Sequence, residues 1–237
     1  MTTEAFSRRR FETGTELAPA FAEWTAALLA QAIAARGAAL LAVSGGSTPL
    51  RYFQALSLRP LDWSRVSITL VDERRVADDD PRSNARLARG ALLKNLASPA
   101  KFAPLADSRL TPDQELGSAR ARIATLPLPA DLVVLGMGED GHTASWFPGA
   151  DGLAEAMDPA ARTLVAPIAP AGGLEPRLTL TGRVILRARN IALQIEGPGK
   201  QATLRRALED GPIPEMPIRA ILRQAADRLT IFESASS

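Results

Sequence analysis

The stretch Ala39-Leu40-Leu41-Ala42-Val43-Ser44-Gly45-Gly46-Ser47-Thr48-Pro49 decides the fold. Its first five residues form a short continuous apolar run, which is typical of a β-strand buried on both faces. Glycines, hydroxyl residues and a proline follow at once, and a helical pattern then runs over 49–56. The stretch therefore predicts a strand, a glycine-rich turn and a helix, the repeating unit of a parallel sheet.

Apolar runs and helical patterns alternate on both sides of this stretch. Further strands are expected over 66–71, 131–135, 191–196 and 228–232. Helices are expected over 16–36, 83–96, 112–126 and 218–225, with one more after Pro198-Gly199-Lys200. This alternation predicts βαβ units. We expect an α/β fold, a single compact domain over residues 1–237, whose Rossmann-like, doubly wound and mostly parallel sheet carries helices on both faces.

The most unusual segments of the chain follow three of the predicted strands. They are Ser44 to Pro49, the run Asp72-Glu73-Arg74, and Gly136-Met137-Gly138-Glu139-Asp140-Gly141-His142. In open α/β sheets, ligands bind outside the carboxyl ends of the strands. The sequence therefore predicts that these segments meet in one functional site.

The first loop has the composition of a phosphate site. Gly45 and Gly46 allow a ligand to approach the backbone closely, and Ser47 or Thr48 can cap the next helix. Free N–H groups at the positive end of a helix, beside the hydroxyl of Ser44, attract phosphate. A plain turn with a good helix cap explains the same residues equally well. The segment is neither a Walker A motif nor a dinucleotide fingerprint.

His142 is the only histidine of the chain, and three glycines and two acids surround it. The following residues, 143–147, read as the start of a short helix, whose N-terminus favours a neutral imidazole that can act as a base. Either Glu139 or Asp140 could orient the ring. The alternative is a structural histidine, but the loop at a strand's carboxyl end favours a functional one.

Charged residues elsewhere are candidates for substrate contacts. A carboxylate such as Asp72 can hold a sugar hydroxyl or orient a water, and Arg74 can clamp a phosphate or an oxyanion. Arg177 and Lys200 lie in polar segments beside prolines, and lysine is rare in this chain. For Asp72 and Arg74, a solvated charged loop is the alternative interpretation.

Composition excludes several classes of chemistry. A chain without Cys has no disulfide, Cys-ligated metal or thiol nucleophile, and one His allows no His-rich metal site. The net charge of +2 gives no argument for nucleic-acid binding. No apolar run approaches the roughly 18 residues of a membrane span. The stretch Ser7-Arg8-Arg9-Arg10-Phe11 looks like a twin-arginine export signal, but no apolar region follows it directly. We therefore expect a basic strand or tail and a cytoplasmic protein.

Taken together, the motifs resemble those of the 6-phosphogluconolactonase family, within the glucosamine-6-phosphate isomerase/deaminase-like superfamily. The resemblance covers residues 10–232 and is carried by Ser44 to Pro49, Val71 to Arg74, Ser83-Asn84 and Gly136 to Gly149. One departure is Trp146, which stands where a smaller apolar residue is frequent in the family.

The resemblance implies hydrolysis of 6-phosphoglucono-δ-lactone to 6-phosphogluconate, in the oxidative pentose phosphate pathway, without a metal or organic cofactor. By position, it implies His142 as general base, and Asp72 and Arg74 as polar active-site groups. From the residues themselves, we expect Asp140 to be catalytic together with His142. It also implies that the loop of Ser44, Gly45, Gly46, Ser47 and Thr48 binds substrate, and that Arg177 and Lys200 bind its phosphate. The expected partner is a small phosphorylated sugar lactone, with no nucleic acid or membrane, and the chain is expected to be a monomer or weak homodimer.

Two other functions remain open at this point. A sugar-phosphate isomerase or deaminase of the same superfamily also needs an acid–base pair near a bound phosphate. Deaminases commonly continue the histidine loop with an Asn-Glu pair, where this chain has Trp146-Phe147-Pro148. A non-catalytic sugar-phosphate sensor usually carries a DNA-binding module, for which this chain has no room beyond its α/β domain.

Overall fold

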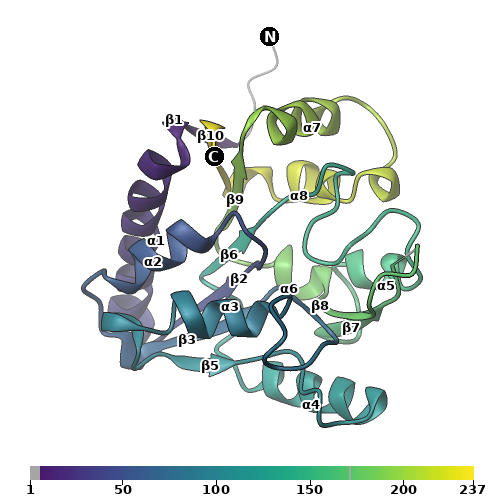
Figure 1. The fold of residues 1–237 in the computed structure, drawn as a ribbon, viewed down its shortest axis with the longest axis horizontal. Helices are drawn as coiled ribbons and strands as arrows, with labels where there is room; N and C mark the ends of the chain where they lie inside the picture. Colours follow the sequence, from purple (N-terminus) through teal and green to yellow (C-terminus); the bar gives the residue numbers. More distant parts are fainter. Residues whose placement is uncertain (1–5, 171) are drawn as a thin grey trace.

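The centre of the molecule is a parallel sheet, seen in a computed structural model that describes residues 6–170 and 172–237 (Figure 1). Its strand order is β1-β10-β9-β6-β2-β3-β5, and every neighbouring pair is parallel. The strands are β1 (Ser7–Thr13), β2 (Ala39–Val43), β3 (Val66–Leu70), β5 (Lys101–Ala103), β6 (Leu132–Leu135), β9 (Ile191–Glu196) and β10 (Leu229–Ser236). The predicted mostly parallel sheet is confirmed.

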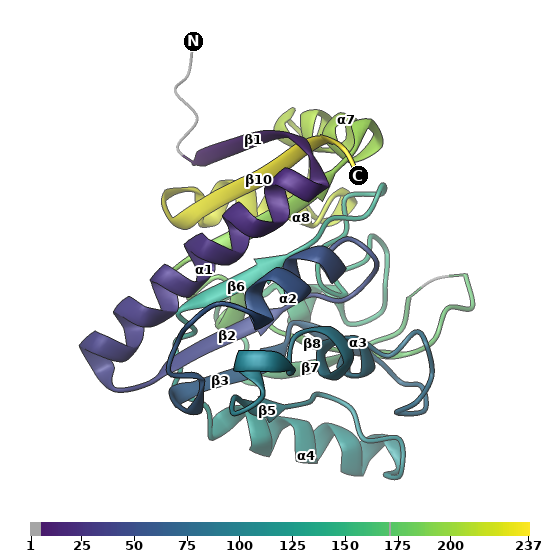
Figure 2. The same ribbon diagram turned by 60° about the vertical axis from the view of Figure 1, so that its left-hand side comes forward.

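Helices cover both faces of this sheet, as predicted. Figure 2 shows α1 and α2 on one side of the sheet, and α7 and α8 on the other. The α-helices are α1 (Gly14–Arg36), α2 (Leu50–Ser57), α3 (Asn84–Ala91), α4 (Pro112–Ala124), α5 (Leu153–Met157), α6 (Gly182–Ile185), α7 (Pro198–Leu208) and α8 (Ile218–Gln224). Short 3-10 turns are η1 (Trp63–Arg65), η2 (Asn95–Ala97), η3 (Ile213–Glu215) and η4 (Ala226–Arg228).

Helix α1 supplies a large part of the core. Its first turn is capped by Thr13, whose hydroxyl accepts a hydrogen bond from the Glu16 N–H at 3.2 Å. By its length and by a mean hydropathy of 1.3 over an 18-residue window, α1 could cross a membrane. Leu17, Phe21 and Leu29 are nevertheless fully buried against the rest of the fold. In this fold the apolar side of α1 is a core face, and a core helix satisfies the same length and hydropathy criteria.

A second, smaller sheet was not predicted. It has the order β4-β8-β7, with β4 (Asp72–Arg74), β7 (Val165–Ile168) and β8 (Arg177–Leu180), and both pairs are antiparallel. The run Asp72-Glu73-Arg74, expected directly after the strand over 66–71, is therefore itself a strand. Strands this short carry no readable period, because three or four residues are too few to display a clear alternation.

Helix α3 is shorter than the predicted 83–96. Ser83 is its N-cap, and the Ser83 hydroxyl accepts a hydrogen bond from the Arg86 N–H at 3.1 Å. The helix ends at Ala91, and the chain then turns into η2. The polar residues Lys94 and Asn95 interrupt the apolar pattern there, and Asn95 adopts a left-handed backbone with φ 49°.

The sheet order fixes where a ligand can bind. From β2 the chain moves through α2 to β3 on one side, whereas from β6 it proceeds towards β9 on the other. The crevice between the carboxyl ends of β2 and β6 is thus a topological switch point, the usual ligand position in open α/β sheets. Ser44 bridges these strand ends, because its hydroxyl donates to the Val134 carbonyl at 3.1 Å and accepts from the Gly136 N–H at 3.2 Å.

Candidate active site

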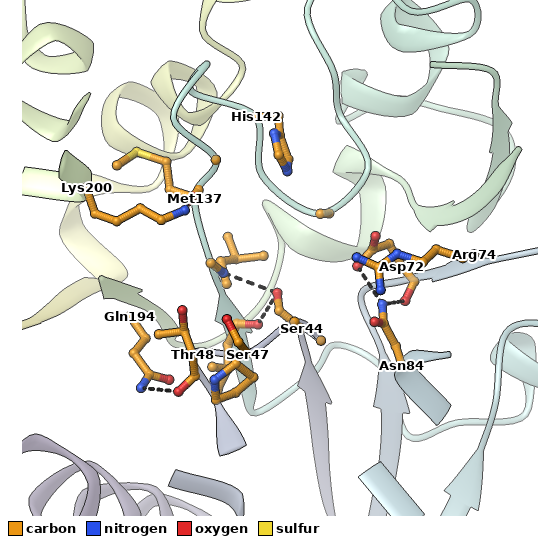
Figure 3. Close-up of a pocket in the computed structure, with 18 of the residues that line it drawn as sticks. Ser44, Ser47, Thr48, Asp72, Arg74, Asn84, Met137, His142, Gln194 and Lys200 are labelled. Atoms are coloured by element: carbon orange, nitrogen blue, oxygen red, sulfur yellow. Dashed lines mark hydrogen bonds between the residues drawn. The ribbon is translucent and has the colours of Figure 1, made fainter. Parts of the chain in front are cut away.

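A cavity of about 210 Å³ opens at this switch point (Figure 3). Every predicted site residue except Asp140 lines it. Its walls are Ser44, Gly45, Gly46, Ser47, Thr48, Pro49, Asp72, Arg74, Asn84, Val134, Leu135, Gly136, Met137, Gly138, His142, Ala144, Arg177, Gln194 and Lys200. The structure therefore brings together the ends of β2 and β6, strands β4 and β8, and the start of α7.

The loop after β2 presents its backbone to the cavity. No described residue accepts a hydrogen bond from the N–H groups of Gly46, Ser47 or Thr48. Gly45 is required because a Cβ there would lie 1.9 Å from Asn84 Oδ1. These N–H groups stand just before the N-terminus of α2, where the helix dipole favours an anion.

The predicted helix cap in this loop is wrong. The N-cap of α2 is Pro49, and neither Ser47 nor Thr48 makes a capping hydrogen bond within the described chain. The Ser47 carbonyl instead accepts from the Leu50 N–H at 3.4 Å, so the chain turns before it enters the helix. Both hydroxyls are left at the cavity wall, available for a ligand.

The histidine loop holds its imidazole through Asp140. Asp140 Oδ1 lies 2.6 Å from His142 Nδ1, and it also accepts from the His142 backbone N–H at 3.1 Å. Burial opposes ionisation of Asp140, but the hydrogen bonds and charge of His142 outweigh it and hold the pKa of that carboxyl below its ordinary value. A carboxylate at Nδ1 selects the tautomer protonated there, which leaves the lone pair on Nε2.

Of the two candidate acids, Asp140 rather than Glu139 contacts the ring. Close approach also explains Gly138, since a Cβ at that position would lie 2.1 Å from His142 Nδ1. His142 thus reaches the cavity wall on a loop shaped around its own ring.

The short helix expected over 143–147 is absent. Thr143 and Trp146 form an isolated antiparallel bridge, and Ala144 between them has φ 49°. The residues turn sharply because the Trp146 side chain is fully buried and its indole N–H donates to the Leu180 carbonyl at 3.2 Å. The helix dipole therefore does not act on His142, and Asp140 is the group that orients it.

Two arginines face each other across β4 and β8. Arg74 and Arg177 are direct partners in the antiparallel register, so their side chains leave the same face of the small sheet. Arg177 is 8% exposed, and burial, with the neighbouring charge of Arg74, lowers its pKa despite the opposing effect of Asp72 and Glu175. Two like charges held this close form a strong site for an anion.

Lys200 stands apart from this arginine pair. It lies in the first turn of α7, and its ammonium donates to the Met137 carbonyl. Figure 3 shows Lys200 and Met137 on one side of the cavity, Asp72 and Arg74 on the other, and His142 above the space between them. The cations therefore flank the cavity instead of forming one cluster.

Three polar residues of the site had no assigned role. Asn84 was part of a motif only; its amide donates to the Asp72 backbone carbonyl at 2.9 Å. Gln194 lines the cavity from β9, and Ser145 donates to Asp72 Oδ2 at 2.6 Å. Gln194 could have been found from the sequence, because it is a polar residue inside an otherwise apolar strand. Nothing in the sequence links Ser145 to Asp72, which lies 73 positions away.

Comparisons with known proteins agree on one family. Residues 12–231 match the family model of glucosamine-6-phosphate isomerases and 6-phosphogluconolactonase. A 6-phosphogluconolactonase of Rhizobium meliloti is 50% identical over 222 residues, which cover 94% of this chain and 96% of that protein. A 6-phosphogluconolactonase of Mesorhizobium japonicum is 46% identical over 228 residues, covering 96% and 95%.

A solved structure agrees with these relatives. The crystal structure of a 6-phosphogluconolactonase from Shewanella baltica superposes with a TM-score of 0.93 at 42% identity. The match covers 97% of this chain and 98% of that chain.

Proposed function

The chain belongs to the glucosamine-6-phosphate isomerase/6-phosphogluconolactonase family, and we propose that it hydrolyses 6-phosphoglucono-δ-lactone to 6-phosphogluconate with His142 as general base. The observation that carries the proposal is the Asp140–His142 pair, 2.6 Å apart, beside a cavity flanked by cations. A base needs an oriented lone pair, and an anionic substrate needs fixed positive charge.

The first step is attack of water on the lactone carbonyl. His142 Nε2 takes a proton as the water oxygen bonds to the carbonyl carbon, a task typically worth about 10²–10⁴-fold in rate. The carbonyl oxygen becomes an oxyanion, and backbone N–H groups or Arg74 stabilise it. Asp140 stabilises the imidazolium formed in this step, because its carboxylate accepts a hydrogen bond from Nδ1–H of the ring.

The second step opens the ring. The tetrahedral intermediate re-forms the carbonyl, the bond from its carbon to the ring oxygen breaks, and His142 returns its proton to the departing alkoxide. The products are a free hydroxyl and a carboxylic acid that ionises in water. No covalent enzyme intermediate is needed, because a strained ester such as a lactone already reacts with water.

The phosphate orients the substrate. We assign it to Arg177 and Lys200 together with the N–H groups of the Ser44–Thr48 loop, all of which line the cavity. Holding the phosphate fixes the lactone carbonyl relative to His142, so that the bimolecular reaction becomes effectively unimolecular. As part of the same proposal, the enzyme acts in the oxidative pentose phosphate pathway of the cytoplasm, without cofactor, as a monomer or weak homodimer.

The test is a coupled lactonase assay on freshly generated 6-phosphogluconolactone, corrected for spontaneous hydrolysis. We expect rapid turnover by the wild type, and a loss of about 10²–10⁴-fold in kcat for His142→Ala with 6-phosphogluconate still bound. Undiminished turnover by His142→Ala would refute the role of the imidazole. Ammonia release from glucosamine 6-phosphate would instead favour a deaminase, and binding without any turnover would favour a sensor.

A further inference from the structure

The guanidinium of Arg177 is buried, and it makes no hydrogen bond to any residue that the structure describes. Its side chain is 9% exposed, its Nε is fully enclosed, and no described residue accepts a hydrogen bond from it. Asp72 Oδ2 at 3.9 Å and Glu175 Oε2 at 3.8 Å form ion pairs with the guanidinium, but both oxygens lie beyond hydrogen-bond distance. The ring of Phe147 also lies against it, with its centroid 5.1 Å from Cζ. A buried cation in this condition is ready for an external anion.

Asp72 is the residue that could cancel this charge. Closing its gap to Arg177 from 3.9 Å to the roughly 2.9 Å of an ordinary N–H···O bond takes a movement of about 1 Å. A buried arginine–carboxylate pair is strong and directional, so the closed arrangement would occupy the arginine donors. Something must hold Asp72 in place.

Ser145 holds it. Its hydroxyl donates to the same oxygen, Asp72 Oδ2, at 2.6 Å, and the Ser145 side chain is fully buried. Its backbone N–H donates to Thr179 Oγ1 at 3.4 Å, and Thr179 is the partner of Asp72 across β4 and β8. On the other side, the Asn84 amide donates to the Asp72 carbonyl and lies 3.5 Å from Oδ1.

We propose that Ser145 is a positioning residue for substrate recognition: by binding Asp72 Oδ2, it keeps Arg177 free for the phosphate of the substrate. This inference rests on the proposed function, which assigns Arg177 to the phosphate. The proposal also accounts for the sharp turn after His142, because this turn places Ser145 of the histidine loop against β4 of the small sheet. Ser145 itself touches no reacting atom.

The primary test is Ser145→Ala. Without the serine hydroxyl, Asp72 turns to Arg177, and we expect the Kd for 6-phosphogluconate and the KM for the lactone to rise about tenfold, the effect of losing one charge-assisted contact. The value of kcat should change much less, because His142 and Asp140 are untouched. Ser57→Ala is the matched control: Ser57 is equally buried, its hydroxyl donates to the Gln54 carbonyl at 2.8 Å, and it does not line the cavity.

The second test adds Asp72→Asn. An asparagine cannot form the ion pair with Arg177, so Ser145→Ala in the Asp72→Asn background should weaken 6-phosphogluconate binding little further. In the double variant, position 72 no longer holds a buried carboxylate that has lost its hydrogen-bond donor. It therefore remains informative if Ser145→Ala alone folds poorly. Circular dichroism and the melting temperature establish the folded state of each variant.

Either of two results would overturn the proposal. One is a Kd for Ser145→Ala equal to that of the wild type and of Ser57→Ala. The other is an equal loss of binding when Ser145→Ala is made in the wild-type and the Asp72→Asn backgrounds. Binding is measured calorimetrically with 6-phosphogluconate, so it reports on Ser145 separately from turnover. An inactive wild type that binds 6-phosphogluconate would refute the proposed reaction, not the role of Ser145.

Discussion

Asp140 shows how one residue defines the chemistry of its neighbour. Glu139 and Asp140 are equivalent in the sequence, since both precede the histidine in a glycine-rich loop. Only the backbone turn distinguishes them: it returns the Gly138 N–H to the His142 carbonyl at 2.9 Å, which brings Asp140 against the ring. The residue pattern offers both acids as candidates to orient the ring, and the contact that Asp140 makes with it depends on a local geometry that no pattern encodes.

Replacing Asp140 by Asn should therefore impair catalysis more than binding. The amide keeps the size of the side chain but removes the charge that stabilises the imidazolium and fixes the tautomer, so we expect kcat to fall about 10- to 100-fold with little change in KM. Steady-state kinetics on the lactone measure both constants. Glu139→Gln, in the adjacent exposed residue, is the control and should match the wild type; equal effects of the two substitutions would contradict the assignment.

At the scale of elements, the N-terminus of α3 is organised by a buried acid. Glu73 is 1% exposed, and its carboxylate accepts hydrogen bonds from the backbone N–H groups of Arg74, Asn84 and Ala85 at 2.7–2.8 Å. The Ser83 hydroxyl adds a fourth bond at 3.2 Å. These contacts dock α3 onto β4 and so bring Asn84 to the cavity wall. The sequence motif Ser83-Asn84 indicated the helix start but not its attachment.

Glu73 should make stability fall as the pH rises. Burial raises its pKa above the ordinary 4.5, outweighing the backbone hydrogen bonds, so between these two values the folded chain binds more protons than the unfolded chain. The free energy of unfolding then decreases with pH across that window. Urea denaturation from about pH 4 to about pH 8 measures it.

Glu73→Gln should flatten that slope, because the amide does not titrate. Exposed Glu23→Gln serves as the control and should follow the wild-type curve. Parallel curves for Glu73→Gln and the wild type would show that Glu73 does not titrate in this range.

The elements that prediction missed share one property: their form depends on distant partners. Helices such as α4 carry local signals, here Pro112 in the first turn and the capping box of Thr111 and Gln114. The turn at 143–147 has no such signal, because it is set by Trp146 and Ser145 bonding to β8 and β4. The same holds for β4 itself, which becomes a strand only by pairing with β8, about a hundred residues later in the chain.

At the scale of the whole molecule, the α/β class and the position of the site followed from strands buried on both faces. β2, β6 and β9 are all buried. An unbroken apolar run identified β2 and β6, whereas the run of β9 is interrupted by Gln194 and Glu196. The order of the strands in the sheet was not predicted. It depends on which strands pair with one another, and the apolar runs do not indicate this. The place where the candidate residues meet could be predicted because the carboxyl ends of parallel strands lie at one edge of the sheet, which is where open α/β sheets bind ligands.

Phe21 links α1 to the sheet and to α2. It is fully buried, with its ring centroid 4.1 Å from that of Tyr52 and 4.2 Å from that of Phe232. Phe21→Ala should lower the free energy of unfolding by about 3–5 kcal/mol, through lost burial and the cavity it leaves. Leu58→Ala, in a side chain 60% exposed, should change it by less than about 0.5 kcal/mol. Urea denaturation compares the two, and equal costs would refute this view of α1 as a core helix.

The position of β10 between β1 and β9 has a consequence for how the protein is made. During synthesis β1 and α1 are made well before β10, their sheet partner, which carries Phe232. A nascent chain halted before residue 229 already contains every candidate catalytic and binding residue, yet it leaves β1 unpaired and the aromatic side of α1 uncovered. A chain that ends there presents an apolar surface of the kind that chaperones and proteases recognise, whereas a chain that extends through β10 can complete the sheet.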